Sequence, residues 1–117
     1  MPPAERRQDR WASLTLVSSY KRHVEELWRE QPRTRPIDAS RLDADVAVRM
    51  VVTGHSREQI AKAILDGARA DRPNEDRDWQ TYARRAVQHA FSPASDQARL
   101  RLEPLRDKLL RIEGSRG

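Results

Sequence analysis

The residues of this sequence best suited to chemistry are cationic. All but three of its 23 basic residues are arginines, and the planar guanidinium group binds phosphates and carboxylates with paired hydrogen bonds. The net charge is +3 over residues 1–36, zero over residues 37–73 and +2 over residues 74–117. The alternative to a phosphate-binding surface is a set of ordinary solvated helix faces. We predict weak phosphate contacts from the linker and fourth-helix residues Arg33, Arg35, Arg84 and Arg85.

The sequence has few residue patterns that indicate catalysis or metal binding. The three histidines, His23, His55 and His89, are dispersed and lack the spacing of metal ligands, so we expect surface or capping roles for them. The sequence contains no cysteine and no glycine-rich loop that could cradle phosphates. Tyr20 and Tyr82 are predicted as aromatics at the edge of the core rather than nucleophiles. We therefore expect no catalytic residue, no cofactor and no metal, and predict that the chain is not an enzyme.

Composition sets the size and class of the molecule. The chain has 117 residues, of which 35% are charged, and a net charge of +5. Leu, Ile, Val and Phe make up only 22 residues, a share near the range of disordered chains. Long apolar runs and a secretory leader are missing, so a cytoplasmic bacterial location is expected. These features predict one small domain over residues 1–117, with an ordered core over about 8–113.

The first positioning element is a long amphipathic helix. A helix is predicted from about residue 8 to residue 30, because apolar side chains recur at helical spacing in Trp11, Leu14, Val17, Val24, Leu27 and Trp28. Two prolines, Pro32 and Pro36, then predict a linker over residues 31–37. That linker carries Arg33 and Arg35.

Capping residues predict the next two helices. Ser40, with Asp43 three residues later, indicates a helix start, and Gly54 occupies a position typical of a left-handed helix end. Ser56 and Gln59 then form a capping-box pattern at the start of a third helix. This third helix buries Ile60, Ala63 and Ile64 and ends near residues 71–74.

Two further helical stretches complete the prediction. Asn74 is expected to cap a fourth helix that carries Trp79, Tyr82, Ala83, Ala86, Val87, Ala90 and Phe91. Ser92-Pro93 then introduces a last stretch over about 94–113, with Leu100, Leu105, Leu109 and Ile112, and Pro104 kinks or divides it. The predicted fold is an all-α bundle of about five helices.

Residues 46–69 have the sequence pattern of a helix-turn-helix. A helix ends at Gly54, a short turn follows, and a capped helix begins, as in proteins whose second helix enters the DNA major groove. Arg57 and Lys62 would be exposed on that helix together with Gln59. Arg49 departs from the apolar residue usual at its position, and acidic neighbours oppose DNA contact. An αα-corner that only packs the bundle is the alternative.

Several segments together resemble a family of plasmid-transfer proteins. Residues 43–56, 59–64, 78–85 and 90–94 are similar to a helical segment of TraI-type conjugative relaxases, located beyond the nicking domain, and related bundles accompany mobilisation primases. The resemblance covers residues 20–95. Such relaxases nick DNA with a Tyr nucleophile and a His-bound metal in another domain, so no catalytic residue is carried over.

The resemblance implies a non-enzymatic accessory bundle. Its expected partners are DNA, bound mainly through phosphates, and relaxosome or type IV secretion proteins; the bundle could also travel with a relaxase. Two rival hypotheses remain open. One is a sequence-specific helix-turn-helix regulator, and the other is a protein-binding adaptor that uses an apolar patch around Trp11 and Trp28.

Overall fold

A computed structural model describes the helical fold over residues 3–30 and 38–114, with side chains from residue 15 onward in the first of these ranges. The helices are α1 (Pro3–Glu30), α2 (Ala39–Val52), α3 (Arg57–Asp71), α4 (Trp79–Phe91), α5 (Asp96–Leu102) and α6 (Arg106–Glu113). Two short 3₁₀ turns, η1 (Pro93–Ser95) and η2 (Glu103–Leu105), flank α5. The described residues include no strand, which confirms the all-α prediction. The predicted linker 31–37 lies outside the described residues.

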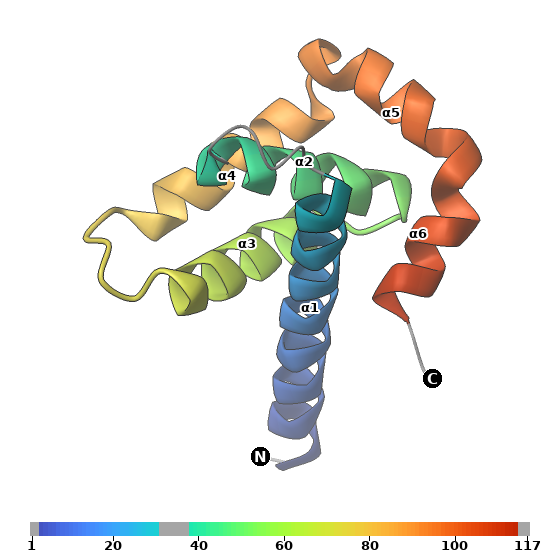
Figure 1. Ribbon diagram of the computed structural model, residues 1–117. Coiled ribbons are helices and arrows are strands. Elements are labelled where there is room, and N and C mark those ends of the chain that lie inside the picture. The colour runs from blue at the N-terminus through green and yellow to red at the C-terminus, as the bar shows by residue number, and fades with distance from the viewer. Residues whose placement is uncertain (1–2, 31–37, 115–117) are drawn as a thin grey trace.

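Helix α3 lies at the centre of the packing, between α1 and α4 (Figure 1). Helix α2 packs on α4 and α5, and α6 returns to contact α1. Ile60, Ala63, Ile64 and Ala68 of α3 have no exposed surface. The predicted buried face of the third helix is therefore confirmed. Helix α3 contacts both α1 and α4.

The buried face of α1 differs from the predicted stripe. Leu16, Tyr20, His23 and Leu27 are buried, at the helical spacing of four, three and four residues. Trp28 is 55% exposed, so its place in the predicted stripe was wrong. Ser19 is buried as well. The side chains of Tyr20 and His23 occupy this face because each bonds a carboxylate, of Asp43 and Glu113 respectively, a feature that counting apolar residues cannot detect. The helix also begins at Pro3, five residues earlier than predicted.

Both ends of α2 are closed by side-chain and backbone hydrogen bonds. Asp38 caps the start, since its carboxylate accepts from the backbone N–H of Ser40 at 2.9 Å. The prediction of Ser40 as the cap was wrong, because Asp38 caps the helix and Ser40 already lies in its first turn. At the other end Gly54 has φ +95°, and the N–H groups of Gly54 and His55 bond the carbonyls of Val51 and Met50. This is the predicted left-handed end.

The starts of α3 and α4 show one confirmed and one corrected cap. Ser56 and Gln59 form the predicted capping box, with reciprocal hydrogen bonds of 3.1 and 2.9 Å. Helix α4 starts later than predicted, because Asp78 rather than Asn74 accepts from the N–H of Thr81 at 3.1 Å. The residues between Asp71 and Asp78 form a connecting loop instead.

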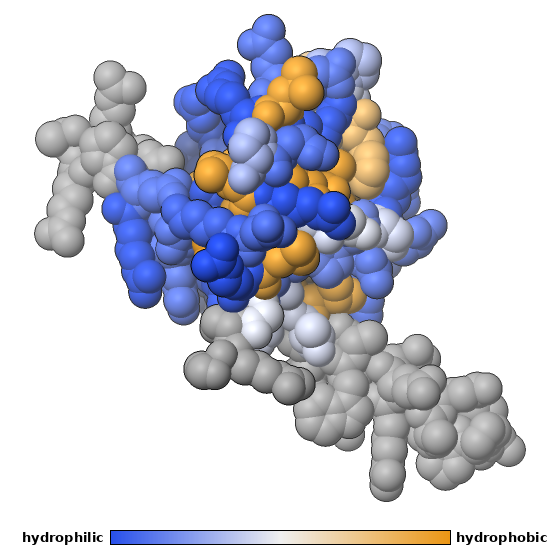
Figure 2. Space-filling view, turned by 90° about the vertical axis from the view of Figure 1, so that its right-hand side faces the viewer, coloured by the Kyte–Doolittle hydropathy of each residue, from blue (hydrophilic) through white to orange (hydrophobic). Residues whose placement is uncertain are grey.

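Two prolines shape the C-terminal arm. Pro93 opens η1 and Pro104 lies in η2, which separates α5 from α6 as predicted. Leu109 is buried, whereas three other leucines of the arm are at least 40% exposed: Leu100, Leu105 and Leu110. Figure 2 looks onto this side and shows apolar atoms scattered among hydrophilic side chains. Among the described residues, no helix is both long and apolar enough to cross a membrane.

Candidate nucleic-acid interface

A groove between α3 and α4 brings basic residues from both helices together. It has a volume of about 640 Å³. Ala61 and Leu65 of α3 and Ala83 and Val87 of α4 form its apolar floor. This surface, called here the α3–α4 groove, exists because both helices turn small or branched apolar residues toward each other and leave their long polar side chains at the edge.

Three of the predicted phosphate-binding residues line this groove. They are Arg57, Lys62 and Arg84, and all three are exposed. The guanidinium of Arg57 lies 4.4 Å from the centre of the Phe91 ring, and Lys62 pairs with Asp66 at 3.4 Å. The sequence predicts these residues on two separate surfaces, and the structure joins them in one groove.

The other predicted cations have different surroundings. Arg85 is exposed on α4 next to Arg84, and neither has an ion-pair partner in the described part of the chain. Arg33 and Arg35 lie outside the described residues. Glu58 also lines the groove, so the cations are accompanied by one carboxylate.

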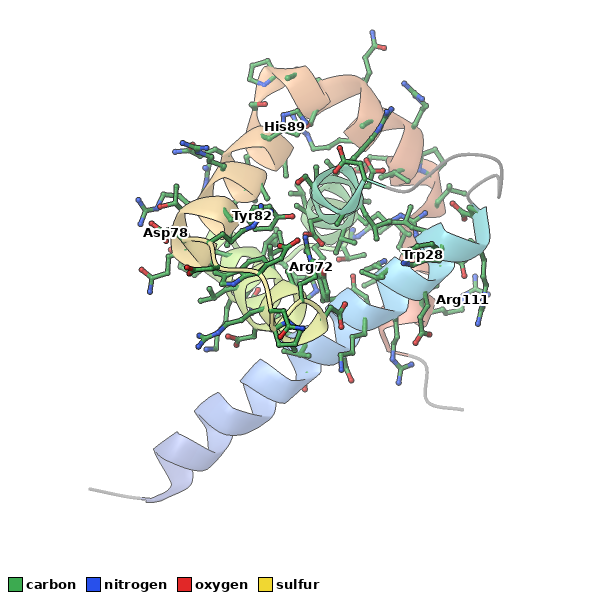
Figure 3. All side chains as sticks on the ribbon, turned by 60° about the vertical axis from the view of Figure 1, so that its left-hand side comes forward. Trp28, Arg72, Asp78, Tyr82, His89 and Arg111 are labelled. Atoms are coloured by element: carbon green, nitrogen blue, oxygen red, sulfur yellow. The ribbon has the colours of Figure 1, made fainter. Side chains whose placement is uncertain are left out.

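Helix α4 also carries a fixed negative charge at its start. Hydrogen bonds from Thr81 lower the pKa of the capping residue Asp78, and Arg84 lowers it further. The carboxylate is fully exposed, so water screens its field. Figure 3 shows Asp78 near one end of α4 and His89 near the other.

A buried carboxylate cluster, missed by the sequence reasoning, supports this pair of helices. Asp43 of α2 is fully buried and accepts a hydrogen bond from the Tyr20 hydroxyl at 2.5 Å. Its other oxygen accepts from the Tyr82 hydroxyl and from Arg72, which directly follows α3. Figure 3 shows Arg72 and Tyr82 close together, and their guanidinium and ring lie 5.6 Å apart. The cluster ties α1, α2, α3 and α4 together.

The environment of this cluster favours one set of protonation states. Burial raises the pKa of Tyr20, and the Asp43 carboxylate raises it further; the same two causes raise the pKa of Tyr82. Burial acts to lower the pKa of Arg72, but hydrogen bonds to Asp43 and Tyr82 outweigh it and raise that pKa. Both phenols therefore stay protonated as donors and Arg72 stays charged. A titrating role for the two tyrosines is disfavoured.

A second cluster corrects the prediction that the histidines are dispersed. Glu113 of α6 contacts Nε2 of His23 at 2.8 Å and Nε2 of His55 at 2.7 Å. The hydroxyl of Thr53 donates to the same carboxylate at 2.6 Å. His23 is fully buried, so its predicted surface role was wrong, while His89 is exposed. Among the described residues, no group of His, Cys, Asp and Glu is arranged to hold a metal ion.

Opposing effects set the pKa values in this cluster, called here the Glu113 clasp. Burial acts to raise the pKa of Glu113, but hydrogen bonds from His23, His55 and Thr53 outweigh it and lower the pKa to about 2. The hydrogen bond to Glu113 raises the pKa of His55 against the effect of burial. Glu113 is therefore ionised in the clasp, and its contacts join α6 to α1 and to the α2–α3 turn.

The fold and the groove define an all-α module with a groove that basic residues from two helices line. Comparison with known proteins finds similarity to DNA primases. Residues 37–90 match the family described as the RepB DNA-primase C-terminal helical domain. Helices α2, α3 and most of α4 lie in that range, and so do the groove cations Arg57, Lys62 and Arg84.

A longer stretch is similar to a protein called a DNA primase in Acidithiobacillus ferrooxidans. The two are 42% identical over 88 residues, which cover 74% of this chain and 25% of that protein. The chain thus spans about a quarter of the length of this curated relative. No solved structure matches the chain. These findings support the primase part of the predicted resemblance, and neither of them names a relaxase.

Proposed function

We propose that the chain is a non-enzymatic helical accessory module of a primase-type plasmid replication or mobilisation protein, and that it binds DNA. The α3–α4 groove would contact phosphates through Arg57, Lys62 and Arg84, with Arg85 beside them. The observation that carries this proposal is the convergence of cations from two helices on one groove, within the segment that is similar to a primase helical domain. Arg33 and Arg35 stay predicted contacts.

The charges around the groove make phosphate binding physically reasonable. Arg84 and Arg85 are consecutive in α4 and both exposed, only Arg84 lines the groove, and no carboxylate in the described part of the chain forms an ion pair with either. Phosphates that bind them displace condensed counterions from the DNA, and the entropy of that release drives association. Glu58 and the Lys62–Asp66 pair oppose strong binding. The expected affinity is therefore modest and electrostatic.

The test is an anisotropy titration of labelled DNA at several salt concentrations. We expect affinity to fall steeply with salt, and we expect the double variant Arg84→Ala/Arg85→Ala to reduce the slope of log K against log salt by about two. Arg111→Ala is the control, because Arg111 is exposed on α6, away from the groove. A lack of binding at low salt would contradict the proposal.

Two other functions each have an observation in their favour. Arg57, Gln59 and Lys62 are all exposed, as a helix-turn-helix regulator requires, although the Gln59 side chain is occupied in the capping box. Binding preference among duplex sequences, together with a dimer in light scattering, would support that function. Trp28, which is 55% exposed, favours an adaptor for relaxosome or type IV secretion proteins. Retention of purified relaxosome proteins by wild type but not by Trp28→Ala would support the adaptor.

A further inference from the structure

The Arg57 side chain has the geometry of a stacking platform. Its guanidinium carbon lies over the Phe91 ring, 4.4 Å from the ring centre, so the ring supports the cation from one side. Arg57 is nevertheless exposed and lines the α3–α4 groove. Because the residue is exposed, a further flat group can reach the guanidinium from the solvent side. Nucleic-acid bases stack well on guanidinium planes.

The groove floor is suited to the same kind of ligand. Ala61, Leu65, Ala83 and Val87 present an apolar surface between the cations. Apolar surface gains free energy by covering apolar or aromatic groups, but gains little against a phosphate backbone. In a duplex the base faces are stacked on one another and only their edges are accessible, whereas a single strand can present base faces.

We infer that the α3–α4 groove selects single-stranded over double-stranded DNA. One base stacks on the outer face of Arg57, which Phe91 supports from behind, and the adjoining nucleotide covers the apolar floor. Lys62 and Arg84 contact the phosphates on either side. This inference rests on the proposed function, because it specifies which form of DNA the groove binds. It needs no sequence preference, since every base has a flat face.

The experiment compares three labelled probes at one salt concentration. They are a single strand, the same strand annealed to its complement, and a strand of equal length whose sugars lack bases. We expect the single strand to bind about tenfold more tightly than the duplex, the size of one stacking contact. The abasic strand should lose most of that gain. Equal affinity for strand and duplex, or for the normal and abasic strands, would overturn the inference and leave the proposed function standing.

A conservative variant separates stacking from charge. Arg57→Lys keeps the positive charge but removes the planar face. We expect it to lower single-strand affinity about fivefold and duplex affinity much less, and to leave the salt slope unchanged because the charge is kept. Phe91→Leu should give a smaller loss of the same kind. Arg111→Lys on α6 is the matched control and should change nothing.

The outcomes assign failure to one proposal or the other. Full single-strand affinity in Arg57→Lys would overturn the stacking role of Arg57. Equal losses for strand and duplex in that variant would also overturn it, because they would indicate a contact that does not depend on base faces. If none of the three probes binds the wild-type chain at low salt, the proposed function itself fails.

Discussion

At the scale of single residues, the charge of Asp43 is balanced entirely by its neighbours. Its carboxylate lies in the core and receives hydrogen bonds from Tyr20, Tyr82 and Arg72. The free-energy cost of removing a charge from water is offset only while such partners are present. The same arrangement is a liability, because removing the carboxylate leaves Arg72 beside an uncharged partner in a largely buried site.

Asp43→Asn is therefore expected to destabilise the fold. The amide keeps the shape of the side chain but cannot neutralise Arg72, and breaking a buried ion pair costs about 3 kcal/mol. Urea unfolding monitored by circular dichroism measures the loss. Asp107→Asn, at an exposed position of α6, should leave the free energy of unfolding within about 0.5 kcal/mol of wild type. Equal stability of the two variants would contradict the role of the cluster.

Gly67 supplies a second prediction at this scale. A β-carbon built there would lie 2.2 Å from Cδ1 of Tyr20, so α1 and α3 approach closely only because this side chain is absent. We expect Gly67→Ala to cost about 1 to 3 kcal/mol through overpacking, despite alanine's better helix propensity. At the exposed Ala70 of the same helix, Ala→Gly should instead cost about 1 kcal/mol. A stabilised Gly67→Ala variant in urea unfolding would refute this explanation.

At the scale of elements, the Glu113 clasp makes the docking of α6 depend on pH. The Glu113 pKa falls from 4.5 to about 2 on folding, so its contribution is complete above pH 4.5 and is lost as the pH falls toward 2. The His55 pKa rises above 6.5, so that contribution is complete below pH 6.5 and is lost as the pH rises through the folded value.

Stability should therefore be greatest between about pH 4.5 and pH 6.5, as far as this clasp determines it. Glu113→Gln should remove the loss of stability on both the acid and the alkaline side, and should lower the maximum free energy of unfolding by about 2 kcal/mol. Thermal unfolding across the pH range measures both effects. Glu103→Gln, at an exposed position of η2, serves as the control. A Glu113→Gln profile parallel to wild type would show that the clasp does not control stability.

Most of the elements could be predicted from the sequence, because their signals are local. The Ser56–Gln59 box, Gly54 and the two prolines of the arm act within a few residues, and each prediction was confirmed. The two wrong caps are local too, because each has a competing carboxylate within four residues. Asp38 caps α2 in place of Ser40, whereas the burial of Asp43 depends on partners from other helices and has no local sign. Asn74 failed because a later residue, Asp78, caps as well and lies next to the apolar run.

The candidate site was predictable in part for the same reason. Arg57, Lys62 and Arg84 could be identified as cations, but their meeting in one groove depends on the packing of α3 against α4. The Phe91 platform follows from that packing too. His23 and Glu113 are separated by 90 residues, and no periodicity links them. An imidazole at helical spacing from Tyr20 and Leu27 was the available sign that His23 faces the core.

At the scale of the whole molecule, burial is distributed unevenly. Helix α3 carries four residues without exposed surface, whereas α5 carries no buried residue. Local opening costs more free energy where more apolar surface is buried. The bundle should thus have a stable centre formed by α1, α2, α3 and α4 and a weaker C-terminal arm.

Native-state hydrogen exchange can test this gradient. We expect the amides of α3 to exchange at a rate close to that of global unfolding, and those of α5 to exchange faster by at least about two orders of magnitude. Mass spectrometry after pepsin digestion resolves the two segments, and the exposed loop between Asp71 and Asp78 provides the upper limit of the rate. Uniform protection over α3 and α5 would mean that the bundle opens as one unit.

The Glu113 clasp also constrains the order in which the molecule can be completed. During synthesis α1, α2, α3 and α4 all leave the ribosome before Glu113 does, so His23 and His55 have no partner while the centre of the bundle assembles. His23 is fully buried in the final structure, with its Nδ1 atom lacking a hydrogen-bond partner. A nascent bundle must therefore leave this site hydrated until the last turn of α6 arrives. Docking of α6 then expels water from around one imidazole by means of a carboxylate 90 residues away.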